Sequence, residues 1–271
     1  MVEARFIGGV GRCGTSLLIK ICSLHPEVAA FYEPRFISDP SGLVDYVRGN
    51  IGLARFRRMM GSPFLNNLIQ GLKETTKSLM RPYSGEAVMR ILDETMNEED
   101  RLEDARAFTL ALLSLPGRRY WVEKTPHTVR YVDVLHDMFG EGLRYIHAIR
   151  EPKDVLASFL TVRWGPKDAL HFAQFYREIM ADAEKTFRKV PPRCYRVVEL
   201  ETLVAQPQNV IPSLFGFLEI PCEPGWVTKA AGSISPADAH VGRYVRELSL
   251  DEQDRVNLSC RDVYETWRQR A

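Results

Sequence analysis

Residues 6–18 constrain the fold of this chain more than any other segment, because they have the pattern of a phosphate-binding loop between a strand and a helix. Gly9 and Gly14 have the spacing of a Walker A loop, and Ser16 stands at its usual hydroxyl position. Apolar residues precede the loop and continue after Ser16 as a helical pattern. Because the first amides of such a helix form an anion site, the segment predicts a strand, loop and helix that bind an anionic group.

The loop lacks the lysine of an ordinary Walker A motif. Thr15 stands where that lysine is expected, and the cation of the loop is Arg12, before the second glycine. A Walker lysine reaches the β and γ phosphates of a nucleoside triphosphate, so its absence argues against ordinary ATP or GTP chemistry. We expect the loop to bind a shorter anionic group. A glycine-rich turn without a ligand is the alternative, but it leaves the Arg, Thr and Ser beside these glycines unexplained.

The composition indicates a soluble enzyme, either one large domain or a core with an insertion, and we take residues 1–271 as a single domain. A formal net charge of +1 gives no sign of nucleic-acid binding. No apolar run approaches the ~20 residues of a membrane span. We expect no signal peptide, since the chain enters its first strand at once. Five scattered cysteines predict reduced thiols and a cytoplasmic location, and without CxxC or spaced histidines we expect no metal site.

Strand and helix patterns alternate at both ends of the chain. The predicted strands are residues 5–9, 28–31, 120–123, 143–149 and 194–198, separated by helical stretches. This alternation predicts an α/β fold of three layers, P-loop-like, with a central parallel sheet flanked by helices. Ligands of such sheets bind beyond the carboxyl ends of the strands. We therefore expect the loop, Glu33, Lys124 and Arg150 to meet in one cleft.

A helical insertion, residues 37–117, separates the second and third predicted strands. Its first part, up to residue 81, is basic and its second part, from residue 86, is acidic. Two solvated helix faces that partly neutralise each other explain this pattern. An acceptor-binding cap with a basic face for an anionic substrate or a membrane surface is the other interpretation. The basic residues concerned are Arg48, Arg55, Arg57, Arg58, Lys73, Lys77 and Arg81.

A second motif lies at residues 145–158. A buried strand ends in Arg150, and Pro152 suits the first turn of the helix that follows. Ser158 lies eight positions after Arg150, about two turns into that helix. The long guanidinium and the short hydroxyl are therefore placed to bind one phosphate from two sides. Taken alone, a strand-end ion pair and an ordinary helix residue explain them equally well.

Together, the two motifs resemble the sulfotransferases that use 3′-phosphoadenosine 5′-phosphosulfate as donor. In that family a loop of the type Pro-Lys/Arg-Ser-Gly-Thr-Thr binds the 5′-phosphosulfate, and an Arg with a Ser eight residues later binds the 3′-phosphate. The resemblance implies that Arg150 and Ser158 bind the 3′-phosphate. It implies that the phosphosulfate is bound by Gly11, Arg12, Cys13, Gly14, Thr15, Ser16 and Leu17. Gly11 and Cys13 depart from the family's Pro and Ser, and neither change removes the amides, the cation or the Thr.

The resemblance spans most of the chain outside the insertion, and it is closest to the bacterial and tyrosylprotein-type branch. The matching segments are His25-Pro26-Glu27-Val28, Tyr32-Glu33-Pro34-Arg35, Glu123-Lys124-Thr125-Pro126 and Val198-Glu199-Leu200-Glu201-Thr202-Leu203. The resemblance implies that Glu33 is the catalytic base, that Arg35 orients the acceptor or the base, and that Lys124 serves the bridging oxygen of the donor. Lys124, Arg12 and the loop amides would then stabilise the leaving phosphate in a single in-line displacement without a metal.

Some assignments are weaker. His127 is the second candidate for the base or for acceptor binding, with a loop or helix-cap residue as the alternative. Arg243 resembles a late basic residue that contacts the 3′-phosphate, and Leu200 stands where the tyrosylprotein-type branch has a Tyr that touches the nucleotide. Cys13 has two interpretations, a small substitute for the family's Ser or a redox thiol beside Arg12 at a helix start, and we favour the first.

Two other functions are open at this point: a P-loop kinase or phosphotransferase, and a non-catalytic nucleotide-binding module. The sulfotransferase reading transfers a sulfuryl group from 3′-phosphoadenosine 5′-phosphosulfate to a hydroxyl and releases 3′,5′-phosphoadenosine. We expect a small-molecule, glycolipid or saccharide acceptor, and the identity of that acceptor is not encoded in any motif.

Overall fold

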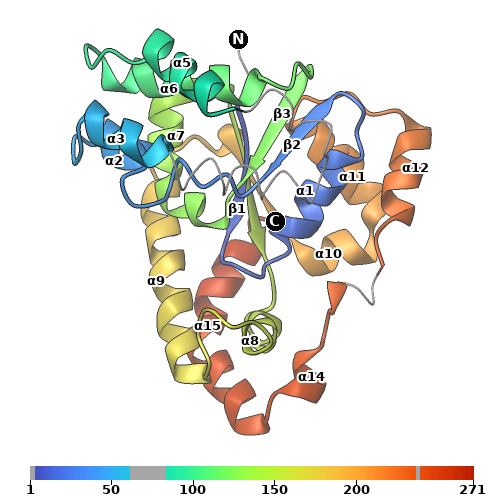
Figure 1. Ribbon diagram of the computed structural model, residues 1–271. Helices are drawn as coiled ribbons and strands as arrows, with labels where there is room; N and C mark the ends of the chain where they lie inside the picture. Colours follow the sequence, from blue (N-terminus) through green and yellow to red (C-terminus); the bar gives the residue numbers. More distant parts are fainter. Residues whose placement is uncertain (1–3, 62–83, 236–238) are drawn as a thin grey trace.

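The computed structural model describes residues 4–61, 84–235 and 239–271. Five strands form one parallel sheet in the order β2-β3-β1-β4-β5 (Figure 1). The central strand β1 pairs with β3 and β4, so that Phe6 lies opposite Glu123 on one side and Tyr145 on the other. The strands are β1 (Ala4–Gly9), β2 (Val28–Tyr32), β3 (Tyr120–Lys124), β4 (Leu143–Ile149) and β5 (Tyr195–Glu199). All five predicted strands are confirmed to within one residue at each end.

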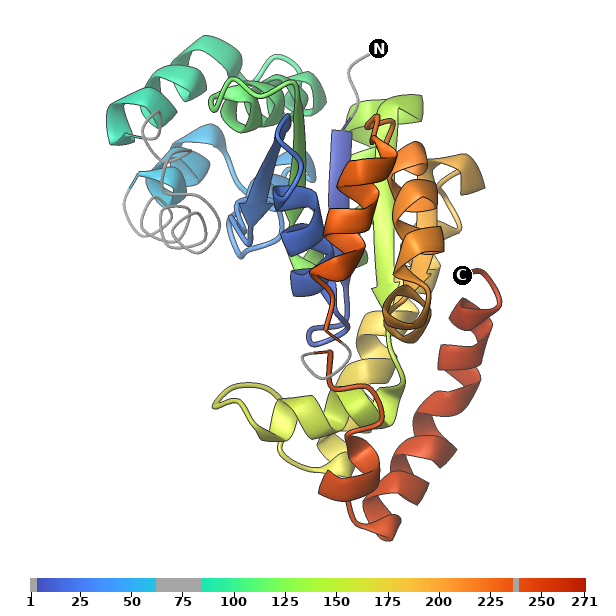
Figure 2. The same ribbon diagram turned by 90° about the vertical axis from the view of Figure 1, so that its right-hand side faces the viewer.

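Helices cover both faces of the sheet, which confirms the predicted three-layer α/β fold (Figures 1 and 2). One face carries α1 (Thr15–Ser23), with α11 (Pro207–Phe217) and α12 (Pro224–Gly232) beside it. The other carries α7 (Val132–Phe139), α9 (Ala169–Phe187) and α15 (Leu250–Arg268). Because helices lie on both faces, every residue of β1 is buried, and the strands read as continuous apolar runs rather than alternating ones.

The insertion between β2 and β3 is helical throughout its described residues, as predicted. Its helices are α2 (Leu43–Val47), α3 (Leu53–Met60), α5 (Gly85–Thr95) and α6 (Arg101–Ser114). Phe56 and Phe36 both pack edge-on against Phe108 of α6, which ties the insertion to one buried cluster. Asp104, buried at 5% exposure, accepts a hydrogen bond from Tyr46 at 2.6 Å.

The charges of the insertion partly neutralise one another. Arg57 of α3 pairs with Asp93 of α5, and Arg106 pairs with Glu103 at 2.9 Å. These contacts agree with solvated helix faces of opposite charge. Lys73, Lys77 and Arg81, which the sequence placed in the basic part, lie outside the described residues.

Shorter elements stand at the carboxyl ends of the strands and build the walls of a cavity there. These are η2 (Pro126–Tyr131), α8 (Pro152–Leu160) and α10 (Leu200–Ala205), while α14 (Tyr244–Glu247) begins directly after the cavity residue Arg243. Within the ranges that the structure describes, no helix has both the length and the apolar character needed to cross a membrane.

Candidate active site

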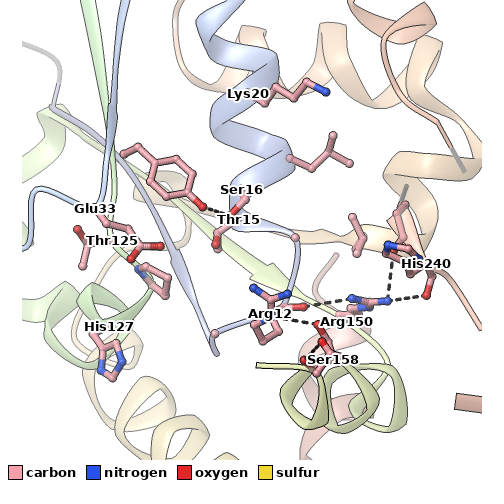
Figure 3. A pocket seen from close by; sticks show the side chains of 18 of the residues that line it. Arg12, Thr15, Ser16, Lys20, Glu33, Thr125, His127, Arg150, Ser158 and His240 are labelled. Carbon is pink, nitrogen blue, oxygen red and sulfur yellow. Dashed lines mark hydrogen bonds between the residues drawn. The ribbon is translucent and has the colours of Figure 1, made fainter. Parts of the chain in front are cut away.

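A cavity of about 970 Å³ opens at the carboxyl ends of β1 to β4, where the sequence placed the ligand site. Figure 3 shows Arg12, Arg150, Ser158 and His240 on one side of the start of α1, and Glu33, Thr125 and His127 on the other. The predicted site residues that line it are Gly11, Arg12, Gly14, Thr15, Ser16, Leu17, Glu33, Arg35, His127, Arg150, Ser158 and Arg243. Cys13 and Lys124 are buried beneath this surface.

The loop between β1 and α1 is shaped as an anion site. Gly14 precedes α1 with a left-handed φ of 90°, and no side chain caps this helix. A Cβ on Gly14 would lie 2.7 Å from Leu200 Cδ1, so both the conformation and the packing require glycine here. Arg12 also has a left-handed φ, 71°. Because the helix start carries no capping side chain, its amides remain available for an anionic group.

Arg12 of the phosphate loop and Ser158 of α8 meet in the cavity. Arg12 Nε donates to Ser158 Oγ at 2.9 Å, although the residues lie 146 positions apart. Arg150, which follows β4 directly, is only 5% exposed, and its Nη1 donates to the backbone oxygen of Arg12 at 3.3 Å. Sheet pairing causes this convergence, because β1 and β4 are neighbours, Arg12 lies in the loop after β1, and Arg150 follows β4.

Glu33 and Lys124 form an ion pair at the ends of β2 and β3. Lys124 Nζ donates to Glu33 Oε1 at 2.6 Å, and the lysine side chain is fully buried while that of Glu33 is 38% exposed. The ammonium lies 3.3 Å from the centroid of the Tyr32 ring, and the Tyr32 hydroxyl is 2.6 Å from Ser16 Oγ. The described contacts therefore run from the phosphate loop through Tyr32 to Lys124, the predicted ligand of the donor's bridging oxygen, and Glu33, the predicted base.

The backbone around Glu33 is strained. Glu33 and Arg35 have left-handed φ angles of 52° and 63° although neither is glycine. Each such residue costs of order 1–3 kcal/mol, and the cost is met only where the surroundings hold the conformation. Arg35 Nε donates a hydrogen bond to Asp39 Oδ1, four residues later, at 3.0 Å, and both residues line the cavity.

His127 lies on the same wall of the cavity, in the second position of η2. Partial burial, followed by the positive charges of Arg130 and Arg35, lowers its pKa. Its turn is held by Thr125 and Thr128, since the Thr128 hydroxyl donates to the backbone oxygen of Thr125 at 2.8 Å. His127 therefore lines the cavity and is also part of a turn. Its position fits both interpretations from the sequence, a second candidate for the base or for acceptor binding, and a loop or helix-cap residue.

The structure corrects the interpretation of Cys13 as a redox thiol. Cys13 is not a low-pKa thiol: it is 2% exposed, and burial raises its pKa to about 12 despite the nearby Arg150. Its side chain packs in the core, so the redox interpretation is wrong.

The insertion contributes only Asp39 to the cavity lining among its described residues, which lie in 37–61 and 84–117. The role of an acceptor cap therefore stays a prediction.

Several cavity residues were not found from the sequence, namely Lys20, Tyr32, Thr161, Trp164, Ser233, Ser235 and His240. Tyr32 and Lys20 had a usable signal, because Tyr32 ends a strand and Lys20 lies one helical turn after Ser16. Trp164 and His240 had none, since each lies in a loop outside both motifs.

One cluster of possible metal ligands occurs among the described residues, although the sequence predicted none. Ligand atoms of His136, Glu141 and Cys194 lie within 4.8 Å of one another, before β4 and β5. Glu141 is also paired with Arg193. The cluster lies at the amino ends of these strands, away from the cavity.

The fold has clear structural relatives. The sulfotransferase domain of the Synechococcus PCC 7002 olefin synthase matches with a TM-score of 0.65 at 20% identity, covering 98% of this chain and 94% of that one. The sulfotransferase domain from the curacin biosynthetic pathway matches with a TM-score of 0.57 at 16% identity, covering 100% and 92%. Sulfotransferase STF1 of Mycobacterium tuberculosis H37Rv matches with a TM-score of 0.51 at 14% identity, covering 94% and 77%.

Comparison of the sequence with known proteins also indicates a sulfotransferase. None of the curated proteins matches this chain. A sequence model of the sulfotransferase family matches residues 5–224, which include the phosphate loop, Glu33, Lys124, Arg150 and Ser158. Because this match covers most of the chain, the protein belongs to the sulfotransferase family.

Proposed function

We propose that this sulfotransferase takes its sulfuryl group from 3′-phosphoadenosine 5′-phosphosulfate and transfers it to a hydroxyl. The observation that supports this donor most directly is the meeting of Arg12, Arg150 and Ser158 at one wall of the cavity. A donor with phosphates at both 3′ and 5′ positions needs two anion sites. The amides at the start of α1 offer one, and the basic group around Arg150 offers the other.

In the proposed reaction the acceptor oxygen attacks sulfur in line with the bridging oxygen of the 5′-phosphosulfate. The S–O bond to the phosphate breaks as the new S–O bond forms, and the electron pair stays on the phosphate. Arg12 and the loop amides stabilise this charge, because they are held in place before the reaction begins. Arg35, which also lines the cavity, would orient the acceptor.

Glu33 would accept the proton of the acceptor hydroxyl. Its carboxylate lines the cavity and is paired at 2.6 Å with Lys124. The lysine side chain is fully buried and its ammonium is paired with Glu33. To contact the donor, the ammonium would have to leave Glu33 and bind the bridging oxygen instead. This exchange would leave Glu33 free to bind the acceptor proton when the donor is in place. The ion pair would then couple donor binding to activation of the base.

The acceptor is expected to be a small molecule, a saccharide or a glycolipid. Two structural neighbours are domains of an olefin synthase and of the curacin biosynthetic pathway, which supports a biosynthetic small molecule. The five free cysteines support the expected cytoplasmic location. A kinase is disfavoured because β4 ends in Arg150, where a magnesium-binding Asp would be needed.

A ligand panel tests the donor class. Thermal shifts are measured with ATP plus magnesium, GTP plus magnesium, adenosine 5′-phosphosulfate and 3′,5′-phosphoadenosine. We expect the largest stabilisation with 3′,5′-phosphoadenosine, because ligand binding to the native state alone raises its stability. A preference for ATP with magnesium would contradict the proposal.

Calorimetry then tests the 3′-phosphate site. Arg150→Ala should weaken binding of 3′,5′-phosphoadenosine by at least about tenfold, the effect of losing one charge-assisted hydrogen bond. Arg101→Ala is the matched control, because Arg101 also donates to two backbone oxygens, those of Tyr46 and Ile51, but lies in the insertion. Unchanged affinity in Arg150→Ala would show that the assignment is wrong.

Turnover identifies the base. Acceptors are first screened among small-molecule, saccharide and glycolipid hydroxyl compounds. With a substrate found in this way, we expect Glu33→Gln to lower kcat by about 10²–10⁴-fold, the usual contribution of general base catalysis. His127→Ala should have a much smaller effect. Near-normal turnover in Glu33→Gln together with loss in His127→Ala would transfer the role to His127.

A further inference from the structure

Asp154 lies behind Arg150 and joins it to a late segment of the chain, residues 239–244, which the family match does not reach. Its side chain is only 1% exposed. Asp154 Oδ2 accepts a hydrogen bond from Gly242 N at 2.7 Å, and Oδ1 accepts one from Tyr244 N at 3.0 Å. The same carboxylate lies 3.6 Å from Arg150 Nη2. One buried carboxylate therefore binds both the arginine and the backbone of the segment.

Arg150 contacts the same segment. Its Nη2 donates to the backbone oxygens of Ala239 at 3.2 Å and His240 at 2.7 Å. Its Nη1 donates to the backbone oxygen of Arg12 in the phosphate loop at 3.3 Å. Arg150 thus bridges the phosphate loop and residues 239–240. We call Asp154, Arg150 and the backbone of residues 239–244 the clasp.

The backbone of the clasp is held in conformations that need support. Gly242 has a left-handed φ of 74°, and His240, which is not glycine, has a φ of 51°. Lys153 adds a further contact, with its ammonium 4.4 Å from the centroid of the Tyr244 ring. A strained residue such as His240 persists only where neighbouring contacts fix it, and those contacts come from Arg150 and Asp154.

The clasp places His240 in the cavity wall beside Arg150 (Figure 3), and Arg243 also lines the cavity. Arg243 donates to Glu247 at 2.9 Å, and its side chain is only 11% exposed. Asp154 itself does not line the cavity. A carboxylate would repel a phosphate at close range, so its contribution must come from the groups it orients.

We propose that Asp154 is a positioning residue for recognition of the donor's 3′-phosphate. By holding the clasp, it sets the direction of the Arg150 guanidinium and brings His240 and Arg243 into the same wall. The inference rests on the proposed function, since it needs a donor that carries a 3′-phosphate. Under this proposal, residues 239–244 make the site prefer a nucleotide that carries a 3′-phosphate over a nucleotide that lacks it.

The test compares two nucleotides in calorimetry: 3′,5′-phosphoadenosine, and adenosine 5′-monophosphate, which lacks the 3′-phosphate. We expect Asp154→Asn to lower the ratio of their affinities by at least about tenfold, because it removes the charge beside Arg150 and one of two backbone hydrogen bonds. The affinity for adenosine 5′-monophosphate should change little. A merely structural defect would weaken both nucleotides together.

Asp104→Asn is the matched control. Asp104 is also buried and also accepts backbone hydrogen bonds, from Glu98 N at 2.9 Å and Asn97 N at 3.2 Å, but it lies in the insertion. It should lower stability and leave the affinity ratio unchanged. If Asp154→Asn does not fold, Gly242→Ala carries the test, because a Cβ there meets no atom within 4 Å but strains the left-handed backbone.

The outcomes separate the two proposals. A ratio that falls in Asp154→Asn but not in Asp104→Asn supports the positioning role. A ratio that falls in neither variant, or equally in both, overturns it and leaves the donor assignment standing. If the unmodified protein does not prefer 3′,5′-phosphoadenosine, the donor assignment itself is wrong, and the role of Asp154 is overturned with it.

Discussion

Replacing Glu33 by Gln removes the negative partner of a fully buried ammonium. Breaking a buried ion pair by removing one partner costs about 3–5 kcal/mol. The cost here is lower, because the Glu33 side chain is 38% exposed and water screens its charge. The Tyr32 ring, 3.3 Å from Lys124 Nζ, also continues to stabilise the cation. We therefore expect Glu33→Gln to lower the free energy of unfolding by about 2 kcal/mol.

The double variant Glu33→Gln/Lys124→Met separates stability from catalysis. Methionine has a similar length and no charge, and replacement of a buried ion pair by apolar groups is often neutral or stabilising. The double variant should therefore recover about 1–2 kcal/mol relative to Glu33→Gln. It should remain inactive, because both the proposed base and the proposed donor ligand are absent.

Urea unfolding at neutral pH, followed by circular dichroism, measures both differences. Asp251→Asn serves as the control, because Asp251 belongs to an exposed pair with Arg255 on α15 and should give no measurable change. If Glu33→Gln is as stable as the unmodified protein, or if the double variant is less stable than Glu33→Gln, the carboxylate is not what holds the buried ammonium, and the coupling that we propose fails.

Three further results are expected. Burial raises the pKa of Glu123 to about 8 from its ordinary 4.5, so stability should fall as pH rises between these values, and Glu123→Gln should remove that part of the slope in urea unfolding. Burial lowers the pKa of His147 to about 3, so stability should fall as pH drops from 6.5 towards 3; a His147→Phe variant that keeps the full slope would contradict this. Iodoacetamide should alkylate the half-buried Cys222 before Cys13, which mass spectrometry of the native protein can check.

Much of the fold was predictable because it depends on local patterns. Apolar runs with strand length, glycines at a strand-to-helix turn and a proline at a first helical turn each restrict the backbone within a few residues. The strand ends followed from these patterns, and with them the positions of Glu33, Lys124 and Arg150 at one edge of the sheet. The interval of eight between Arg150 and Ser158 likewise follows from helical geometry.

The site was less predictable wherever a residue depends on a distant segment. Of the two interpretations of Cys13, a redox thiol or a small substitute for Ser, burial in the core excludes the first. Lys124 was expected to face the cleft, yet its ammonium is covered by Tyr32 and Glu33. An acceptor-binding cap was one interpretation of the insertion; among its described residues only Asp39 lines the cavity, and the role of a cap stays a prediction.

The chain's own sequence therefore determined which residues stand at the ends of strands and which loop has the conformation of an anion site, because backbone conformation responds to neighbours a few positions away. Only the tertiary structure decided what each of these side chains touches. Arg150 and His240 lie 90 positions apart and share a 2.7 Å hydrogen bond. Their contact arises because the order β2-β3-β1-β4-β5 and the return of the chain after α12 bring them together, and no local pattern encodes that distance.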